Sequence, residues 1–208
     1  KWWSIEKEKG KKEFFTSGVE RAAQMGFKLL GNFDQVPHFY AAADPKKPVS
    51  SYSAWWNSYP PKDYEDWRTY MVETFKAFGK WVKYWEIWNE PDGGFLSVPP
   101  GKTKEGAYLD LVTNTSRFAA EEKLGLTLIG GVVSSLSRPF YSNVLVSGVA
   151  AAVDAASFHF YYEDQSAEEA PGITAVDWVK WTKSLKGRTG KPLEAWHTEG
   201  GPWLADGA

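Results

Sequence analysis

The sequence contains no cysteine in its 208 residues, which excludes disulfide frameworks, thiolate zinc sites and cysteine nucleophiles. It also lacks any apolar run approaching the ~18 residues that span a membrane. Neither sign of charge dominates, because 24 Lys and Arg face 26 Asp and Glu. This balance argues against nucleic acid or an anionic membrane as a partner. No glycine-rich GxGxxG turn or phosphate loop follows an apolar segment, so we expect no nucleotide cofactor.

Aromatic residues are abundant by contrast, with 12 Trp, 12 Phe and 10 Tyr. So many flat rings either fill a core or line a groove in which their faces stack on a ligand. Trp67, in an amphipathic segment over 63–80 that Asp63 would cap, is expected to pack in the core.

The chain alternates between amphipathic and apolar segments. We expect helices over 13–25, 63–80, 104–124, 139–147 and 177–185, and strands over 27–33, 81–89, 126–133, 153–161 and 192–198. The strands are apolar at consecutive positions, which is typical of parallel strands covered on both faces. The pattern predicts one α/β domain over 1–208, either a doubly wound sheet or a (β/α)8 barrel.

Two glutamates end two of the expected strands. Glu90 precedes Pro91, which cannot donate to a strand ladder, and Glu199 precedes two glycines that let the backbone turn. In a closed barrel the carboxyl ends of all strands face one mouth, where barrel enzymes place their chemistry. Two carboxyl groups across such a mouth can perform glycoside hydrolysis, one as proton donor and the other as nucleophile.

The segment Trp88-Asn89-Glu90-Pro91 resembles the signature of clan A glycoside hydrolases, which are retaining (β/α)8 barrels. The resemblance implies that Glu90 is the general acid/base, that Asn89 binds the sugar 2-hydroxyl and that Glu199 is the nucleophile. It implies cleavage of a β-linked poly- or oligosaccharide without cofactor or metal.

The resemblance continues along the chain. Residues 2–10 and 29–37 are similar to segments after strand two and around strand three, with family 39 or family 5 nearest. The chain would then hold an incomplete TIM barrel, from the tail of unit two through strand seven, and the missing barrel segments are expected from the rest of the full-length chain. A secreted or extracellular location is favoured by the resemblance alone.

Further residues are expected near the substrate. His159 and Tyr161 resemble strand-six residues of the clan, with Tyr161, or Tyr162 in the other register, donating to Glu199. Aromatic or polar side chains on the loops after the strands are candidates for the sugar groove, namely Trp55, Trp56, Phe95, Trp203 and His38.

Further expectations concern other polar residues and other functions. Glu86 should point into the barrel and need a partner, and His197, two residues before Glu199, should share its face. A metal site of His159, His197 and Glu199 is a weaker explanation of these residues. A catalytically silent carbohydrate-binding barrel and a sugar-phosphate enzyme remain alternative functions, the latter on the faint hint of Gly200-Gly201.

Overall fold

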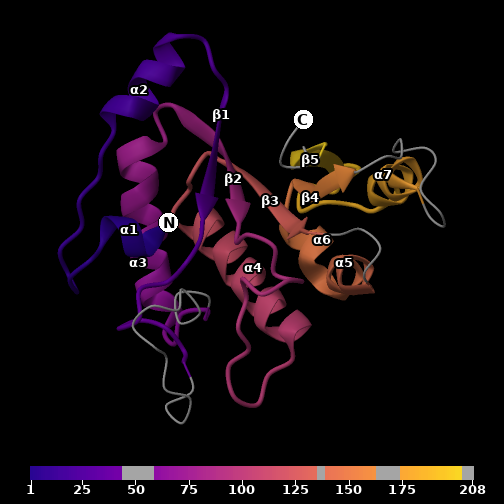
Figure 1. Ribbon diagram of the computed structural model, residues 1–208, viewed down its shortest axis with the longest axis horizontal. Helices are drawn as coiled ribbons and strands as arrows, with labels where there is room; N and C mark the ends of the chain where they lie inside the picture. Colours follow the sequence, from indigo (N-terminus) through magenta and orange to yellow (C-terminus); the bar gives the residue numbers. More distant parts are fainter. Residues whose placement is uncertain (44–58, 135–138, 163–173, 203–208) are drawn as a thin grey trace, which may run out of the picture.

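The structure is a computed structural model that describes residues 1–43, 59–134, 139–162 and 174–202. Five parallel strands form one curled sheet in chain order, a half-barrel with its helices on the outside (Figure 1). The strands are β1 (Leu29–Phe33), β2 (Val82–Ile87), β3 (Thr127–Val133), β4 (Ala155–Tyr162) and β5 (Glu194–Pro202). This architecture is consistent with part of a (β/α)8 barrel.

The helices fall close to the amphipathic segments of the sequence. They are α1 (Trp2–Ile5), α2 (Ser17–Gln24), α3 (Tyr64–Phe78), α4 (Lys104–Glu121), α5 (Pro139–Val144), η2 (Leu145–Val149), α6 (Ala150–Ala152) and α7 (Ala175–Ser184). Among the helices of the described ranges, none is long and apolar enough to cross a bilayer. The short helix α1 was not expected, and α2 begins at residue 17 rather than 13.

Side-chain caps explain where the three long outer helices begin. Asp63 accepts a hydrogen bond from the Glu65 N–H at 2.9 Å, as the sequence predicted for α3. Thr103 caps α4 in the same way. Thr174 and Asp177 form a reciprocal capping box at the start of α7. Each cap satisfies an amide that the helix itself leaves without a partner.

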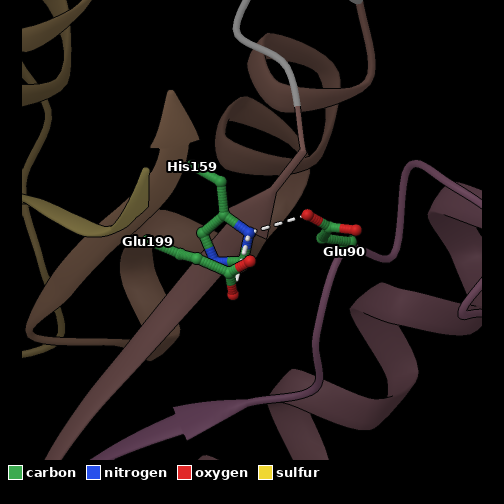
Figure 2. A group of neighbouring side chains, drawn as sticks. All are labelled: Glu90, His159 and Glu199. Carbon is green, nitrogen blue, oxygen red and sulfur yellow. Dashed lines mark hydrogen bonds and ion pairs between the residues drawn. The ribbon is translucent and has the colours of Figure 1, made fainter. Parts of the chain in front are cut away.

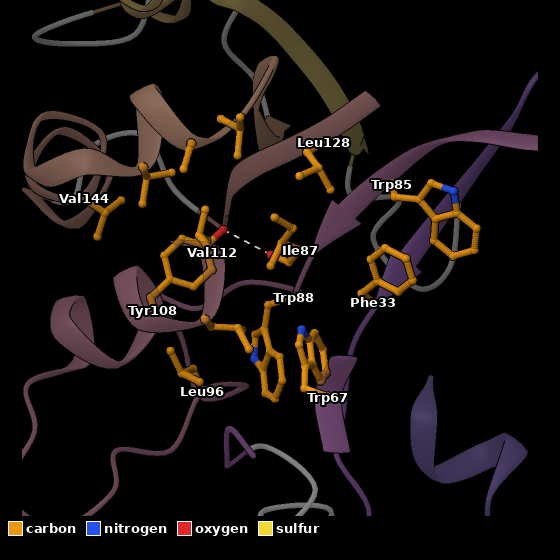
Figure 3. Packing of buried hydrophobic residues seen from close by; sticks show 14 of the residues in the cluster. Phe33, Trp67, Trp85, Ile87, Trp88, Leu96, Tyr108, Val112, Leu128 and Val144 are labelled. Atoms are coloured by element: carbon orange, nitrogen blue, oxygen red, sulfur yellow. Dashed lines mark hydrogen bonds between the residues drawn. The ribbon is translucent and has the colours of Figure 1, made fainter. Parts of the chain in front are cut away.

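Aromatic rings fill the layer between the sheet and the outer helices (Figure 3). Phe33 of β1 stacks on Trp85 of β2 with ring centroids 4.3 Å apart. The ring of Trp67 is fully buried, and its indole N–H donates to the Thr115 hydroxyl on α4 at 2.9 Å. The expected packing role of Trp67 is therefore confirmed.

The concave face of the sheet brings non-neighbouring strands into contact. Tyr84 of β2 and Trp196 of β5 have ring centroids 5.1 Å apart, although two strands separate them in the sheet. Ser157 of β4 donates to Glu86 of β2 at 2.8 Å across β3. The sheet is therefore curled tightly enough for the carboxyl ends of its strands to converge.

Replacing Trp67 by alanine tests the aromatic layer. Removal of the buried indole leaves a cavity and removes the N–H from which the Thr115 hydroxyl accepts. We therefore expect the free energy of unfolding to fall by about 3–5 kcal/mol. Urea denaturation followed by circular dichroism measures the loss. Phe15→Ala is the matched control, because Phe15 is 73% exposed and its truncation should cost within about 0.5 kcal/mol. Equal losses in the two variants would contradict the packing described here.

Candidate active site

The strand end that carries Glu90 adopts an unusual backbone conformation. Trp88 and Glu90 both have positive φ angles, 69° and 41°, which non-glycine residues rarely adopt. Neighbouring strands hold this conformation. The Trp88 N–H donates to the Phe33 carbonyl at 2.9 Å, and the Asn32 amide of β1 donates to the Trp88 carbonyl at 3.1 Å. The position of Glu90 is therefore set by β1 and β2 together rather than by a free loop.

A bulge in β3 fixes Glu90 from the other side. Gly131 pairs with Ser157 and Val133 with Phe158, so Val132 is an extra residue, and its φ of 46° is an outlier for a β-branched side chain. The Val132 carbonyl accepts a hydrogen bond from the Glu90 N–H at 2.9 Å. The strained backbone of β3 thus contacts the strained backbone after β2.

A second bulge, in β5, decides which side chain shares the face of His159. Phe158 pairs with His197 and His159 pairs with Glu199, which leaves Thr198 as the extra residue. His197 stacks on Phe158 with ring centroids 5.6 Å apart. Glu199 instead pairs with His159, and its Oε2 atom lies 3.7 Å from His159 Nδ1. The expectation that His197 shares the face of Glu199 is therefore wrong, because the bulge interrupts the two-residue alternation on which it rested.

Three side chains from three strand ends meet at the mouth of the half-barrel (Figure 2). The His159 Nδ1 atom lies 2.8 Å from Glu90 Oε1 and 3.7 Å from Glu199 Oε2. One ligand atom of each residue lies within 4.8 Å of the other two. The His159 side chain is only 1% exposed, while Glu90 is 16% and Glu199 51% exposed. Two carboxyl groups thus face each other beside a buried imidazole, with solvent access on the side of Glu199.

Tyr161 completes this group. Its hydroxyl donates a hydrogen bond to Glu199 Oε1, the contact that the sequence led us to expect. This hydrogen bond, some desolvation and the negative charges of Glu199 and Glu90 raise the pKa of Tyr161 to about 12. The hydroxyl therefore stays protonated, and able to donate, at any pH near neutrality.

The other expected site residues are distributed more widely. Asn89 is half-buried beside Glu90, and its side-chain amide makes no hydrogen bond to any of the residues that the structure describes. Phe95 is 44% exposed on the loop after β2, where its carbonyl accepts from the Trp88 indole at 2.8 Å. His38 is exposed and packs edge-on against Phe39. The remaining three candidates lie outside the described residues: Trp55, Trp56 and Trp203.

Some contacts that hold the site together could not be predicted from the sequence. The Asp92 carboxylate accepts from both the N–H and the hydroxyl of Ser134 at 2.8 Å, which ties the loop after Glu90 to the end of β3. Glu86 has the buried position that was expected, and its partner is the Ser157 hydroxyl rather than a cation. Such pairs join residues far apart in the chain, so no local pattern predicts them.

Comparison of the sequence with protein-family models and with curated proteins finds no match. Among solved structures, a family 39 β-xylosidase from Caulobacter crescentus matches 97% of this chain and 44% of its own, at 19% identity and a TM-score of 0.50. A monomeric β-xylosidase from Caulobacter crescentus CB15 matches 93% of this chain and 42% of its own, at 18% identity and a TM-score of 0.49. A family 51 α-L-arabinofuranosidase from Bifidobacterium longum matches 60% of this chain and 28% of its own, at 20% identity and a TM-score of 0.42. The chain spans less than half the length of these proteins, and the likeness is one of fold.

The Tyr161–Glu199 contact can be tested by titration. In Glu199→Gln the amide oxygen still accepts a hydrogen bond but carries no negative charge, so the pKa of Tyr161 should fall from about 12 toward the free value of about 10. NMR spectra of the ¹³C-tyrosine-labelled protein between about pH 9 and 11 follow the change, and Tyr161→Phe assigns the signal. Glu194→Gln, at the other end of β5, is the control. An unchanged titration in Glu199→Gln would show that the two groups are not in contact.

Proposed function

We propose that this chain carries the catalytic pair of a retaining glycoside hydrolase acting on a β-linked poly- or oligosaccharide, with Glu90 as general acid/base and Glu199 as nucleophile. The supporting observation is that the two carboxyl groups face each other with oxygens within 4.8 Å. Retaining glycosidases hold their carboxyl groups ~5–5.5 Å apart, whereas inverting enzymes leave ~6.5–9.5 Å for a water molecule. The short separation favours direct attack on the sugar.

The surroundings of the two glutamates suit different roles. Glu199 is half-exposed, and Tyr161 engages its Oε1 atom, which leaves Oε2 for attack on the anomeric carbon. Glu90 is more buried, is fixed through its backbone to β3, and contacts the His159 ring. A largely buried carboxyl group on a backbone that is held in place is suited to deliver a proton to the leaving oxygen at a defined place.

The reaction then proceeds in two displacements. In the first, Glu90 donates its proton to the glycosidic oxygen while Glu199 forms a bond to the anomeric carbon and the aglycone leaves. In the second, Glu90 removes a proton from water, the water oxygen attacks the anomeric carbon, and the bond to Glu199 breaks. The configuration at the anomeric carbon is inverted twice and so retained.

Neighbouring side chains provide candidate substrate contacts. The side-chain amide of Asn89, next to the proposed acid and without a partner among the residues that the structure describes, is a candidate to bind a sugar hydroxyl. Phe95 offers an exposed ring on which the apolar face of a sugar can stack, and His38 is a more distant candidate. His159 lines the site as the group between the two carboxylates.

The fold agrees with this proposal. The family 39 β-xylosidase from Caulobacter crescentus shares the arrangement of strands and helices over 97% of this chain. We infer that the chain forms part of a single (β/α)8 catalytic domain whose remaining segments belong to the full-length protein. The activity proposed here is that of the whole protein.

Glu90→Gln tests the acid through the leaving group. We expect kcat/KM for phenyl β-glycosides to fall by about 10²–10⁴-fold, because the poor leaving group needs a proton. The kcat/KM for 2,4-dinitrophenyl β-glycosides should be much less affected, since that leaving group departs without a proton, whereas kcat falls because the second displacement still needs Glu90 as base. Kinetics of the full-length protein measure both, with Glu194→Gln as control. An equal loss for both leaving groups would argue against Glu90 as the acid.

Product stereochemistry tests the double displacement. With wild type, ¹H NMR during early hydrolysis should show the β-anomer first, followed by slow mutarotation, and Glu199→Gln should give no product. First appearance of the α-anomer would rule out retention. If the wild type binds β-linked glycans but cleaves none of a broad panel, the silent carbohydrate-binding barrel becomes the better explanation.

A further inference from the structure

The group of Glu90, His159 and Glu199 has a second chemical property. It presents one imidazole nitrogen and two carboxylate oxygens that all lie within 4.8 Å of one another at the mouth of the half-barrel (Figure 2). We propose that these three residues bind one divalent transition-metal ion, Zn²⁺ being the type case, and that the bound ion blocks the active site. The metal set considered from the sequence differs, since it included His197 and omitted Glu90.

The distances fit such an ion. Zn²⁺ binds nitrogen and oxygen ligands at ~2.0–2.2 Å, so the ligand atoms of a tetrahedral site lie about 3.3 Å apart. The His159 Nδ1 atom is 2.8 Å from Glu90 Oε1 and 3.7 Å from Glu199 Oε2, on either side of that value. The two carboxylates lie within 4.8 Å, and rotation about their soft terminal torsions closes the remaining gap.

The three ligand residues differ in their exposure and in how firmly the fold holds them. The His159 ring is 1% exposed, and the backbone of Glu90 is held by β3, so these two ligands are preorganised. Glu199 is 51% exposed, which gives the ion a path of entry and leaves its fourth position for water. Three protein ligands with one open position is the arrangement of accessible zinc sites.

The ligand types determine which ions should bind. A mixed nitrogen and oxygen set suits Zn²⁺, Co²⁺ and Ni²⁺. Mg²⁺ and Ca²⁺ prefer six or more oxygen ligands and should bind much more weakly to two carboxylates and an imidazole. The two negative charges also match the charge of one divalent ion.

Inhibition follows from the position of the ion, and this part rests on the proposed function. An ion between the two carboxylates occupies the place where the anomeric carbon of the sugar would lie, and it engages the oxygens that would donate the proton and attack. Zn²⁺ should therefore inhibit competitively with substrate, and removal by a chelator should restore activity. Binding of the ion itself does not depend on whether the protein cleaves glycosides.

Isothermal titration calorimetry of the protein with ZnCl₂ tests the site without reference to activity. We expect one ion per chain, with affinity reduced at least about tenfold in Glu199→Gln and in His159→Gln. His197→Gln and Glu194→Gln, on the same strand but off the site, are the matched controls and should bind as wild type does. Co²⁺ should give a visible absorption band that Glu199→Gln abolishes. Thermal melting checks that each variant is folded. Glu199→Gln is the variant expected to disturb folding least, because the Glu199 side chain is half-exposed.

The results separate the two proposals. Absence of Zn²⁺ binding, or equal binding by wild type and Glu199→Gln, would overturn the metal site whether or not the protein is a glycosidase. Zn²⁺ binding that depends on the three residues, in a protein that cleaves no glycan, would leave the metal site intact and remove the proposed catalysis. Binding stronger for Mg²⁺ than for Zn²⁺ would also contradict the ligand argument.

Discussion

The parallel pairing of five consecutive strands is the constraint on which the rest of this structure depends. Because each strand pairs with the next along the chain, all carboxyl ends lie at one edge of a curled sheet. Residues separated by 109 positions in the sequence, such as Glu90 and Glu199, can then face each other. The outer layer of aromatic rings stabilises this curvature from behind, and the Tyr84–Trp196 contact does so within the concave face.

Departures from regular strand geometry place Glu90 and Glu199 at the strand ends. Val132 and Thr198 are extra residues in β3 and β5, and Trp88 and Glu90 have left-handed backbone conformations after β2. Each such feature costs free energy and persists only where the surrounding structure holds it in place. Here the restraint is visible as hydrogen bonds from Glu90 to Val132 and from Asn32 to Trp88.

The same three side chains serve both proposals, for one electrostatic reason. Two carboxylates brought close together need a positive or proton-donating group between or beside them. His159 and Tyr161 supply the hydrogen bonds in the free protein. An oxocarbenium-like sugar or a divalent ion would meet the same concentration of negative charge. The negative charge that the proposed catalysis would use is therefore also the charge that a cation would bind.

Local patterns in the sequence determined the alternation of strands and helices and the cap at Asp63. They also determined the burial of Trp67 and the strand-end positions of Glu90 and Glu199. Each of these features depends on residues near one another in the chain. Aromatic content alone could not separate core rings from exposed ones such as Phe95. Only the tertiary structure decided that His197 turns away from Glu199, that Ser157 is the partner of Glu86 and that His159 lies between the two glutamates. The physical reason is that one inserted residue in a strand moves every following side chain to the opposite face of the sheet. Contacts across a sheet are also set by the register of its strands, which no local stretch of sequence specifies.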